Sequence, residues 1–532
     1  MKIVSYNKAK TKLTKHEKIG QFFMPAAFIN DSEEQIQEIE RLIREQHIGG
    51  LCFFHSRASA ATNFEGAKKI VYNENSFETL KKLIERYQKV AKYPLLVSID
   101  AEWGLVMRIE STPQYPYAIT LGALQNQSDL IFQVGKQIAQ DCKATGIHWN
   151  LAPVVDINNN PNNPVIGYRS FGEDKLQVTQ NALAFVKGTE CEGILTCLKH
   201  FPGHGDTEVD SHLGLPLISK SKKALLQNEL YPFQELINEG IDSIMAGHLS
   251  IPALADGDEI PSSLSKKMLK DLLRDQMNFK GVVISDALNM HAVSKNYPIK
   301  GELEWLAFDA GNDVLCFAEH IKEGIEAIYE NATNQQIEAS FERFWKLKEK
   351  AFNIKNPNLN FALSDPNPLN KKIATESLTV FNGDLGDFIK SDFIGIQVST
   401  TPEKLTFFEQ IQSKKTFSYF NTSEITLDEI QDKIRAKENL LLALYPPKAK
   451  PANYFDIPKQ QIDFINELIA TKKVALYLFG NPYVLNHIHT NNAKAIVIAY
   501  QNFEVFQEIA AQHFLGEIVA KGKVPVLITS EL

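Results

Sequence analysis

The chain has 532 residues, of which 44% are hydrophobic and 23% charged, and its formal net charge is -8 at pH 7. A typical domain size of about 100 to 250 residues predicts two or three domains with sizeable cores. The hydrophobic fraction excludes a mainly disordered chain. The acidic balance argues against a broad basic surface for nucleic acid or anionic membranes, so a neutral substrate is easier to accommodate.

The cysteines and the N-terminus indicate the compartment. The five cysteines are dispersed along the chain and odd in number, which predicts buried free thiols and no disulfide framework. No apolar stretch reaches the length of about 18 residues that a membrane span needs, and the first residues lack the apolar region of a signal peptide. We expect a cytoplasmic protein. A periplasmic location, after removal of a leader, is the alternative.

Short apolar runs alternate with helix-like segments from residue 20 to residue 317. Each run is nearly continuously apolar and ends in polar residues, as parallel strands buried on both faces do. Segments between them, such as 32–46 and 76–91, place apolar residues at helical spacing. The eight runs are 21–27, 48–54, 94–100, 146–153, 193–201, 242–250, 281–288 and 312–317.

Eight strands alternating with helices predict an α/β fold with a (β/α)8 barrel over residues 1–355, and a doubly wound open sheet is the main alternative. Active sites of such barrels lie at the carboxyl ends of the strands. The polar residues that end the runs are therefore expected around one mouth. They are Asp100, Asn150, Lys199, His200, His248 and Asp286.

A second α/β pattern follows the barrel. The Asn- and Pro-rich stretch 356–372 indicates a linker. Residues 373–532 then predict a smaller α/β/α sandwich. Its strand-like runs are 377–383, 393–400, 439–447, 473–481, 494–501 and 524–530.

The stretch KHFPGHGDTEVDSHLGLP, residues 199–216, gathers three histidines and three acidic residues after the fifth run. Pro202, Gly203 and Gly205 favour a loop that brings backbone close to a ligand. It is not a phosphate-binding loop, because its lysine precedes the glycines. Metal ligation is an alternative through His200, His204, His212, Asp206 and Asp210. Their spacing matches no common zinc motif, so neither a metal nor an organic cofactor is expected.

A proton-transfer role needs an imidazole oriented by a carboxylate. Asp210 and His212 are separated by one residue and can form such a dyad, although an isolated pair of this kind is often only a solvated contact. Asp286 ends the seventh apolar run, where a charge is costly unless it faces a mouth with partners or caps the next helix. An aspartate and a proton donor facing one pocket are what a retaining glycosidase requires.

Five motifs carry a family resemblance. They are KHFPGHGDTEVDSHLGLP, GVVISDALNM, SIDAEWGLVMR, NLAPVVDINNN and IGYRSFGED. Together they resemble the bacterial β-N-acetylglucosaminidases of glycoside hydrolase family 3 in the two-domain form. The match covers about residues 12 to 350, and the C-terminal part resembles the family's sandwich domain more loosely. The first motif is specific, because family members that act on plain glucosides lack it.

The resemblance implies a retaining exo-β-N-acetylglucosaminidase that acts on peptidoglycan fragments or chito-oligosaccharides through a covalent glycosyl-aspartate intermediate. It implies that Asp286 is the nucleophile and that Asp210 and His212 are the acid/base dyad. The implied sugar-binding residues are Asp100, Arg169, Lys199 and His200, with His248 lining the same pocket. A glycoside phosphorylase, a non-catalytic carbohydrate-binding protein and a metal-dependent hydrolase are the alternatives. The oligomeric state is left open.

Two features depart from the family pattern. Many relatives have two glycines after the acidic pair of the third motif, whereas this chain has Glu102, Trp103 and Gly104. The segment 55–77 also has the character of an insertion after the second run. Both lie where the leaving group would be selected, so we expect them to alter specificity and not the core chemistry.

Overall fold

The structure is a computed structural model that describes residues 3–55, 72–207, 214–353, 362–402 and 405–529. Contacts divide the chain into two compact units. The first unit contains residues 1–115, 131–157 and 178–365, and the second contains 116–130, 158–177 and 366–532. The second unit thus includes two segments from the N-terminal half of the chain. A single boundary near residue 365 would assign these segments to the first unit. The predicted boundaries at 355 and 373 remain a prediction.

All eight apolar runs predicted in the first unit contain strands. Their pairings are parallel throughout. The strands are β1 Phe23–Met24, β2 Ala26–Phe28, β3 Gly50–Phe54, β4 Leu96–Ile99, β5 Trp149–Asn150, β6 Leu198–Phe201, β7 Ser243–Ala246, β8 Val282–Ser285 and β9 Leu315–Cys316.

The strand pairings run in a ring. β2, β3, β4 and β5 form one sheet, β6, β7 and β8 a second, and β9 pairs with β1. A bridge between Trp149 and Leu195 joins β5 to the residues before β6, and a bridge between Ile284 and Val314 joins β8 to β9. The Gly49 N–H donates to the Phe23 carbonyl at 3.1 Å, which links β1 to the start of β3. The unit is therefore barrel-like, and its carboxyl strand ends share one side.

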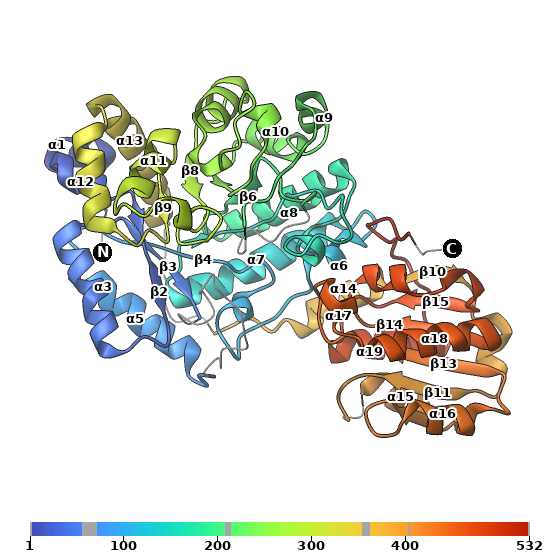
Figure 1. The fold of residues 1–532 in the computed structure, drawn as a ribbon. Helices are drawn as coiled ribbons and strands as arrows, with labels where there is room; N and C mark the ends of the chain where they lie inside the picture. The colour runs from blue at the N-terminus through green and yellow to red at the C-terminus, as the bar shows by residue number, and fades with distance from the viewer. Residues whose placement is uncertain (1–2, 56–71, 208–213, 354–361, 403–404, 530–532) are drawn as a thin grey trace. The chain divides into compact units, whose positions relative to one another are not determined.

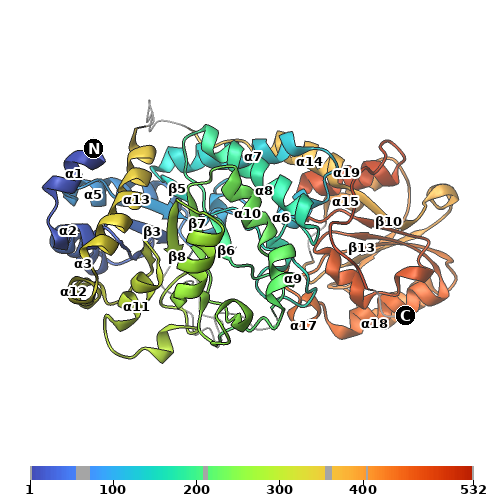
Figure 2. The same cartoon turned by 90° about the horizontal axis from the view of Figure 1, so that it is seen from above.

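Helices cover the outside of this ring, and Figure 2 shows β6, β7 and β8 side by side with α10 and α13 near them. α3 illustrates why they form: Ser32 and Gln35 make a capping box, and Ile36, Ile39 and Ile43 recur on the buried side. The helices are α1 Tyr6–Lys12, α2 Lys15–Gly20, α3 Glu33–Gln46, α5 Ser76–Val90, α7 Ser128–Thr145, α8 Lys175–Cys191, α9 Lys222–Gln227, α10 Tyr231–Asn238, α11 Glu302–Ala310, α12 Ile321–Asn331 and α13 Asn334–Phe352.

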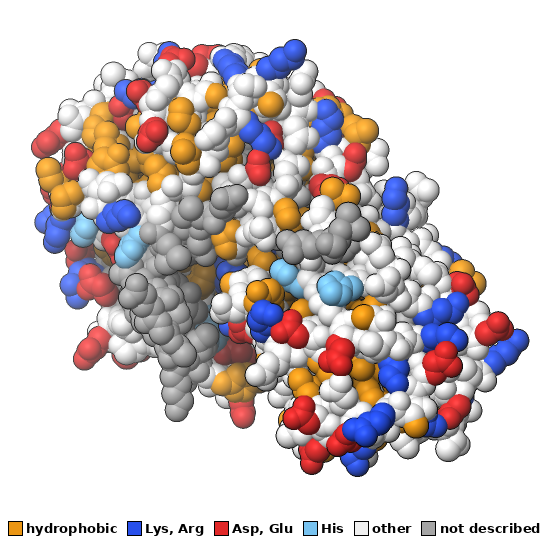
Figure 3. Space-filling model, turned by 45° about the vertical axis from the view of Figure 1, so that its right-hand side comes forward, with side chains coloured by type: hydrophobic (Ala, Val, Ile, Leu, Met, Phe, Trp, Pro, Cys, Tyr) orange, Lys and Arg blue, Asp and Glu red, His pale blue; other side chains and the backbone are white. Residues whose placement is uncertain are grey.

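One hydrophobic cluster collects buried side chains from successive strands, including Met24, Leu96, Trp149 and Ile284. Burying each such side chain contributes about 1.5 to 3 kcal/mol. The cysteines are all free, as predicted, and four are buried, whereas Cys191 is exposed. Acidic and basic side chains are interspersed on the face of the molecule in Figure 3. None of the described helices is long and apolar enough to cross a membrane.

The second unit has a six-stranded sheet in the order β10-β15-β14-β13-β11-β12, and several of these strands lie side by side in Figure 1. β10 is antiparallel to β15, and the other pairs are parallel. The strands are β10 Thr379–Gly383, β11 Ile394–Val398, β12 Tyr419–Asn421, β13 Asn439–Leu444, β14 Lys473–Leu478 and β15 Ala495–Ile498. The helices are α6 Ala118–Gly122, α14 Asn367–Ser377, α15 Thr406–Gln412, α16 Leu427–Ile434, α17 Ala452–Phe455, α18 Lys459–Thr471 and α19 Glu504–Phe514.

Helices lie on both faces of this sheet. Ile430 of α16 and Ile465 of α18 share a buried cluster with Leu442 of β13, whereas Phe407 of α15 packs on Tyr477 of β14, 4.8 Å between ring centroids. The predicted strand at 524–530 is wrong, because residues 524–529 are irregular. The short strand β12 was missed, and α14 begins inside the predicted linker.

Candidate active site

Lys199 and Asp100 meet at the carboxyl ends of β6 and β4. The Lys199 ammonium lies 2.7 Å from Oδ1 of Asp100 and 2.7 Å from Oε1 of Glu102. The lysine is only 2% exposed, so it has left water almost completely and needs these two carboxylates. The predicted pair of sugar-binding residues is thus brought together, and Glu102 is an added partner.

Arg108 completes this cluster from the other side of Asp100. One of its guanidinium nitrogens lies 2.9 Å from Oδ2 of Asp100, and the guanidinium stacks on the Phe54 ring with its carbon 3.6 Å from the centroid. Burial alone would raise the pKa of Asp100, but the charges of Lys199 and Arg108 outweigh it and hold that pKa well below its usual range. Asp100 is therefore a fixed carboxylate that can accept hydrogen bonds from sugar hydroxyls.

His200 is held by Asp156, a residue to which the sequence assigned no role. Nδ1 of His200 lies 2.7 Å from Oδ2 of Asp156, and the same carboxylate accepts the backbone N–H groups of His200 and His204. Burial would raise the pKa of Asp156, and the neighbouring His200 counteracts it, so that the pKa is lowered. A carboxylate on Nδ1 fixes the orientation and the tautomer of the ring.

Asp286 directly follows β8 and is half-buried. Its backbone N–H donates to the Ala246 carbonyl at 2.9 Å, and its Oδ1 accepts the Ala287 N–H at 2.7 Å. His248 contacts the same segment, since its Nε2 lies 3.0 Å from the Ala287 carbonyl oxygen. Its Nδ1 lies 2.7 Å from the Ser263 hydroxyl. Both nitrogens of the buried His248 thus contact protein groups, which suits it to positioning the segment that carries Asp286.

The buried thiol of Cys197, directly before β6, is sensitive to the charges of the surrounding strand ends. Burial raises its pKa to about 12, the charges of Asp100 and Asp286 add to the rise, and the charge of Lys199 opposes it. The strands of the ring are parallel, so their carboxyl ends lie on one side of it, and Asp100 and Asp286 each directly follow such an end. The expected mouth stays a prediction.

Asp210, His212 and Arg169 are the other predicted site residues. Asp210 and His212 are outside the described residues, so the structure gives no account of the dyad. Arg169 lies in the short 3-10 helix η2, Gly167–Arg169, within the second unit. One of its guanidinium nitrogens donates to the Val165 carbonyl at 3.2 Å. Among the described residues, no group of three or more His, Cys, Asp or Glu side chains is arranged to hold a metal ion.

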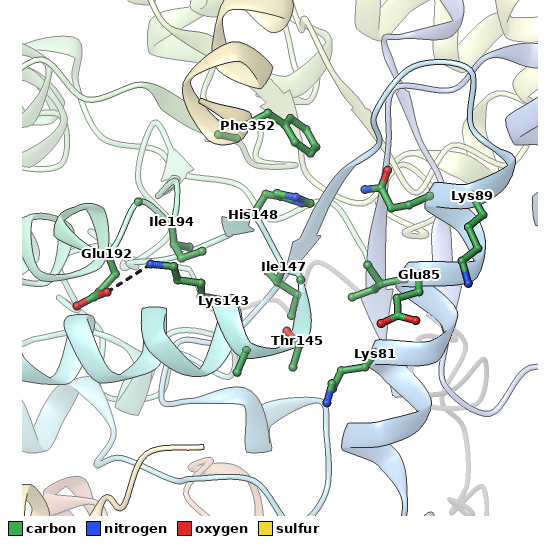
Figure 4. A pocket seen from close by; sticks show the side chains of 16 residues that line it. Lys81, Glu85, Lys89, Lys143, Thr145, Ile147, His148, Glu192, Ile194 and Phe352 are labelled. Carbon is green, nitrogen blue, oxygen red and sulfur yellow. Dashed lines mark ion pairs between the residues drawn. The ribbon is translucent and has the colours of Figure 1, made fainter. Parts of the chain in front are cut away.

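A separate pocket with a volume of about 410 Å³ lies at the amino ends of the strands. Ile147 and His148 precede β5, and Ile194 precedes β6. Figure 4 shows these side chains with Phe352, and the ion pair of Lys143 with Glu192 at the edge. None of the predicted catalytic or sugar-binding residues within the described ranges lines it, and parallel barrels carry their chemistry at the other end. It is not the active site.

Sequence reasoning missed three members of the site, although each had a partial signal. Glu102 and Arg108 stand in the motif SIDAEWGLVMR, and Asp156 stands in NLAPVVDINNN. All three follow strands, and each has a partner on another strand: Asp156 contacts His200, Glu102 pairs with Lys199, and Arg108 stacks on Phe54. Only the closing of the ring brings them together.

Comparisons with known proteins identify the family of the chain. The model of the "Glycosyl hydrolase family 3 N terminal domain" matches residues 14–347, which is more than half of the chain. Beta-hexosaminidase A of Pseudoalteromonas piscicida is 34% identical over 342 residues, 59% of this chain and 55% of that protein. The chain thus spans about half of that relative's length.

Solved structures extend the similarity over nearly the whole chain. A glycoside hydrolase family 3 β-N-acetylglucosaminidase from Paenibacillus sp. str. FPU-7 has a TM-score of 0.77 and 26% identity, covering 98% of this chain and 100% of that one. A β-glucoside phosphorylase has a TM-score of 0.80, covering 99% and 96%, but at 21% identity it shows the fold alone. The chain therefore belongs to glycosyl hydrolase family 3, in which it is similar to bacterial β-hexosaminidases.

Proposed function

We propose that the protein is a retaining exo-β-N-acetylglucosaminidase that removes terminal β-linked N-acetylglucosamine from peptidoglycan fragments or chito-oligosaccharides. The observation that carries the proposal is the half-buried carboxylate of Asp286 at the end of β8, on the side of the ring where Lys199 pairs with Asp100. The similarity to a β-hexosaminidase and to a β-N-acetylglucosaminidase supports the choice of sugar. As an architecture, we propose a complete (β/α)8 barrel followed by an α/β/α sandwich.

In this proposal the Asp286 carboxylate attacks the anomeric carbon and forms a glycosyl-aspartate, while the leaving oxygen takes a proton from His212. Water deprotonated by the same imidazole then releases the sugar, and the configuration is retained. Asp210 orients the imidazole and stabilises its charged form. Asp100, Lys199, His200 and Arg169 hold the sugar hydroxyls, and this positioning lowers the entropy cost of attack.

A mechanism-based label tests sugar, reaction class and nucleophile together. The full chain is incubated with a 2-acetamido-5-fluoro sugar that bears a good leaving group, and its intact mass and peptide map are recorded. We expect one covalent sugar on the peptide that contains Asp286 and none on the Asp286→Asn variant. Labelling of another residue, or no labelling while the substrate is turned over, would contradict the proposal.

Phosphorolysis is the second candidate, because the chain shares its fold with a β-glucoside phosphorylase. An imidazole that has given its proton to the leaving group is neutral. It therefore repels an incoming phosphate less than a carboxylate would. Rates with and without phosphate, with detection of sugar 1-phosphate, separate the two reactions. We expect the rate to be the same with and without phosphate, and we expect no sugar 1-phosphate. Unchanged activity after exhaustive chelation is expected as well, and its loss would favour a metal-dependent hydrolase.

A further inference from the structure

A cleft in the second unit lies where three neighbouring parallel strands end. Its walls are the segments 446–449 after β13, 479–481 after β14 and 500–502 after β15, and Tyr117, Ile119 and Tyr168 complete the lining. All of these residues belong to the second unit. In sheets with helices on both faces, ligands bind outside the carboxyl ends of the strands, so the position of the cleft is that of a ligand site.

The lining of the cleft combines aromatic faces with amides. Tyr117 and Tyr168 are half-buried and meet edge to face, 4.7 Å between centroids. The amide of Asn481 donates to the Ala449 carbonyl at 2.9 Å and ties two walls together, whereas Asn502 is exposed. Aromatic rings pack against the C–H face of a pyranose, and amides bond its hydroxyls.

The charge of the lining points to a neutral ligand. Among the lining residues that the structure describes, only Lys448 is charged, and its ammonium lies 2.5 Å from Oδ2 of Asp456. A ligand with a net charge would find no unpaired countercharge there. The two strand ends also approach closely, since a Cβ on Gly480 would lie 2.8 Å from Cγ of Pro446.

Backbone strain concentrates around this cleft. Tyr500 lies in its wall with a φ of 64°, a value that an aromatic residue rarely adopts. The four residues Asn453–Asp456 are also left-handed, with φ between 52° and 61°, at a cost of about 1 to 2 kcal/mol for each residue. The Phe455 carbonyl accepts the backbone N–H of Lys448 at 3.1 Å, so this turn holds the segment 446–449 in place. Strain of this kind is retained mainly at functional sites.

We propose that this cleft binds one neutral pyranose ring of a glycan. This proposal rests on the proposed function, in which Arg169 binds a sugar. Arg169 directly follows Tyr168 in the short helix η2, and Tyr168 lines the cleft. A sugar is therefore the ligand class that we assign to the cleft. The ring lies between Tyr168 and the amide-bearing strand ends, with Asn502 as a hydrogen-bonding partner for its hydroxyls.

The test uses the full chain with Asp286→Asn, so that the glycan is not hydrolysed, and measures chitotriose binding by calorimetry. Two binding events are expected, one at the catalytic site and one at the cleft. Asn502→Trp, which fills the cleft, is expected to weaken the cleft event at least tenfold and to leave the other unchanged, and Tyr168→Ala is expected to weaken the cleft event as well. The matched control is Asn491→Trp, the same change at an exposed residue of the same unit outside the cleft, and it is expected to have no effect. Melting temperatures of all variants are recorded.

Two results overturn the proposal. One is equal chitotriose affinity in Asn502→Trp, Tyr168→Ala and the control, and the other is no chitotriose binding at millimolar concentration. Failure of the proposed function is recognised separately, by the absence of the fluorosugar adduct on Asp286. If that adduct fails to form while Asn502→Trp still weakens chitotriose binding, the cleft stands as a carbohydrate site in a protein with another activity.

Discussion

The ammonium group of Lys199 lies 2.7 Å from Oδ1 of Asp100, although the two residues are 99 positions apart. The lysine is 2% exposed, and removing one partner of a buried ion pair costs about 3 to 5 kcal/mol because the other charge is left unpaired. The pair is therefore costly to break whatever its role, and an activity effect has to be separated from a stability effect.

Lys199→Met is expected to lower kcat/KM for an aryl N-acetyl-β-glucosaminide by about 100-fold, because Asp100 loses the charge that positions it. The double variant Lys199→Met, Glu102→Gln also removes the carboxylate that forms the second ion pair of Lys199, while Asp100 keeps its ion pair with Arg108, so we expect partial recovery of the melting temperature without recovery of activity. Lys350→Met serves as the control, since Lys350 pairs with Asp242 and Glu190 outside the site. Unchanged kcat/KM for Lys199→Met would remove Lys199 from the site.

Asp156→Asn tests the orientation of His200. The amide keeps an oxygen for the backbone N–H groups of His200 and His204 but loses the charge that holds the imidazole. We expect kcat/KM to fall by at least about tenfold, with a smaller change in melting temperature than Asp156→Ala produces. Asp242→Asn is the control at the other end of the ring. Equal activity of Asp156→Asn and the native enzyme would show that His200 needs no oriented tautomer.

A leaving-group series separates the proton donor from the nucleophile. A leaving group of low pKa needs little protonation, so His212→Ala should retain more activity on a nitrophenyl glycoside than on a natural disaccharide. Asp210→Ala should show the same trend more mildly, because the imidazole stays in place. Asp286→Ala should abolish both reactions. If His212→Ala loses the same factor across the whole series, the donor role is refuted.

The buried Lys348 gives a stability prediction with a defined pH window. Burial lowers its pKa to about 7, and its ammonium contacts Oε1 of Gln21 at 2.6 Å and the Gly49 carbonyl at 3.1 Å. Between that pKa and the ordinary lysine value near 10.5, the unfolded chain binds a proton that the folded chain lacks, so stability rises with pH.

Denaturant unfolding of the native protein and of Lys348→Met from pH 6 to pH 10 measures this effect. The native protein should gain up to about 1.4 kcal/mol per pH unit relative to the variant above pH 7. Lys18→Met is the matched control, because Lys18 is buried but pairs with Glu338 at 2.6 Å. Parallel stability curves for the native protein and Lys348→Met would contradict the prediction.

Local pattern was sufficient to predict the strands of the first unit and to select candidate site residues. The continuous apolar runs identify strands buried on both faces, and the first polar residue after each run marks its carboxyl end. Asp100 and Asp286 were predicted in this way. Lys199 occupies the corresponding position inside β6. β12 was not predicted, because it has only three residues. It also lies at the edge of its sheet, where an apolar run is not required.

The sequence by itself determined the alternation of strands and helices, the family motifs and the residue types of the chemistry, because these follow from local periodicity and short spacing. Only the tertiary structure decided which side chains are partners. Asp156 with His200, Arg108 with Phe54 and Glu102 with Lys199 each join separate parts of the chain. Such contacts depend on how the strands close into a ring, and a strand's own sequence carries no record of which distant residue will face it.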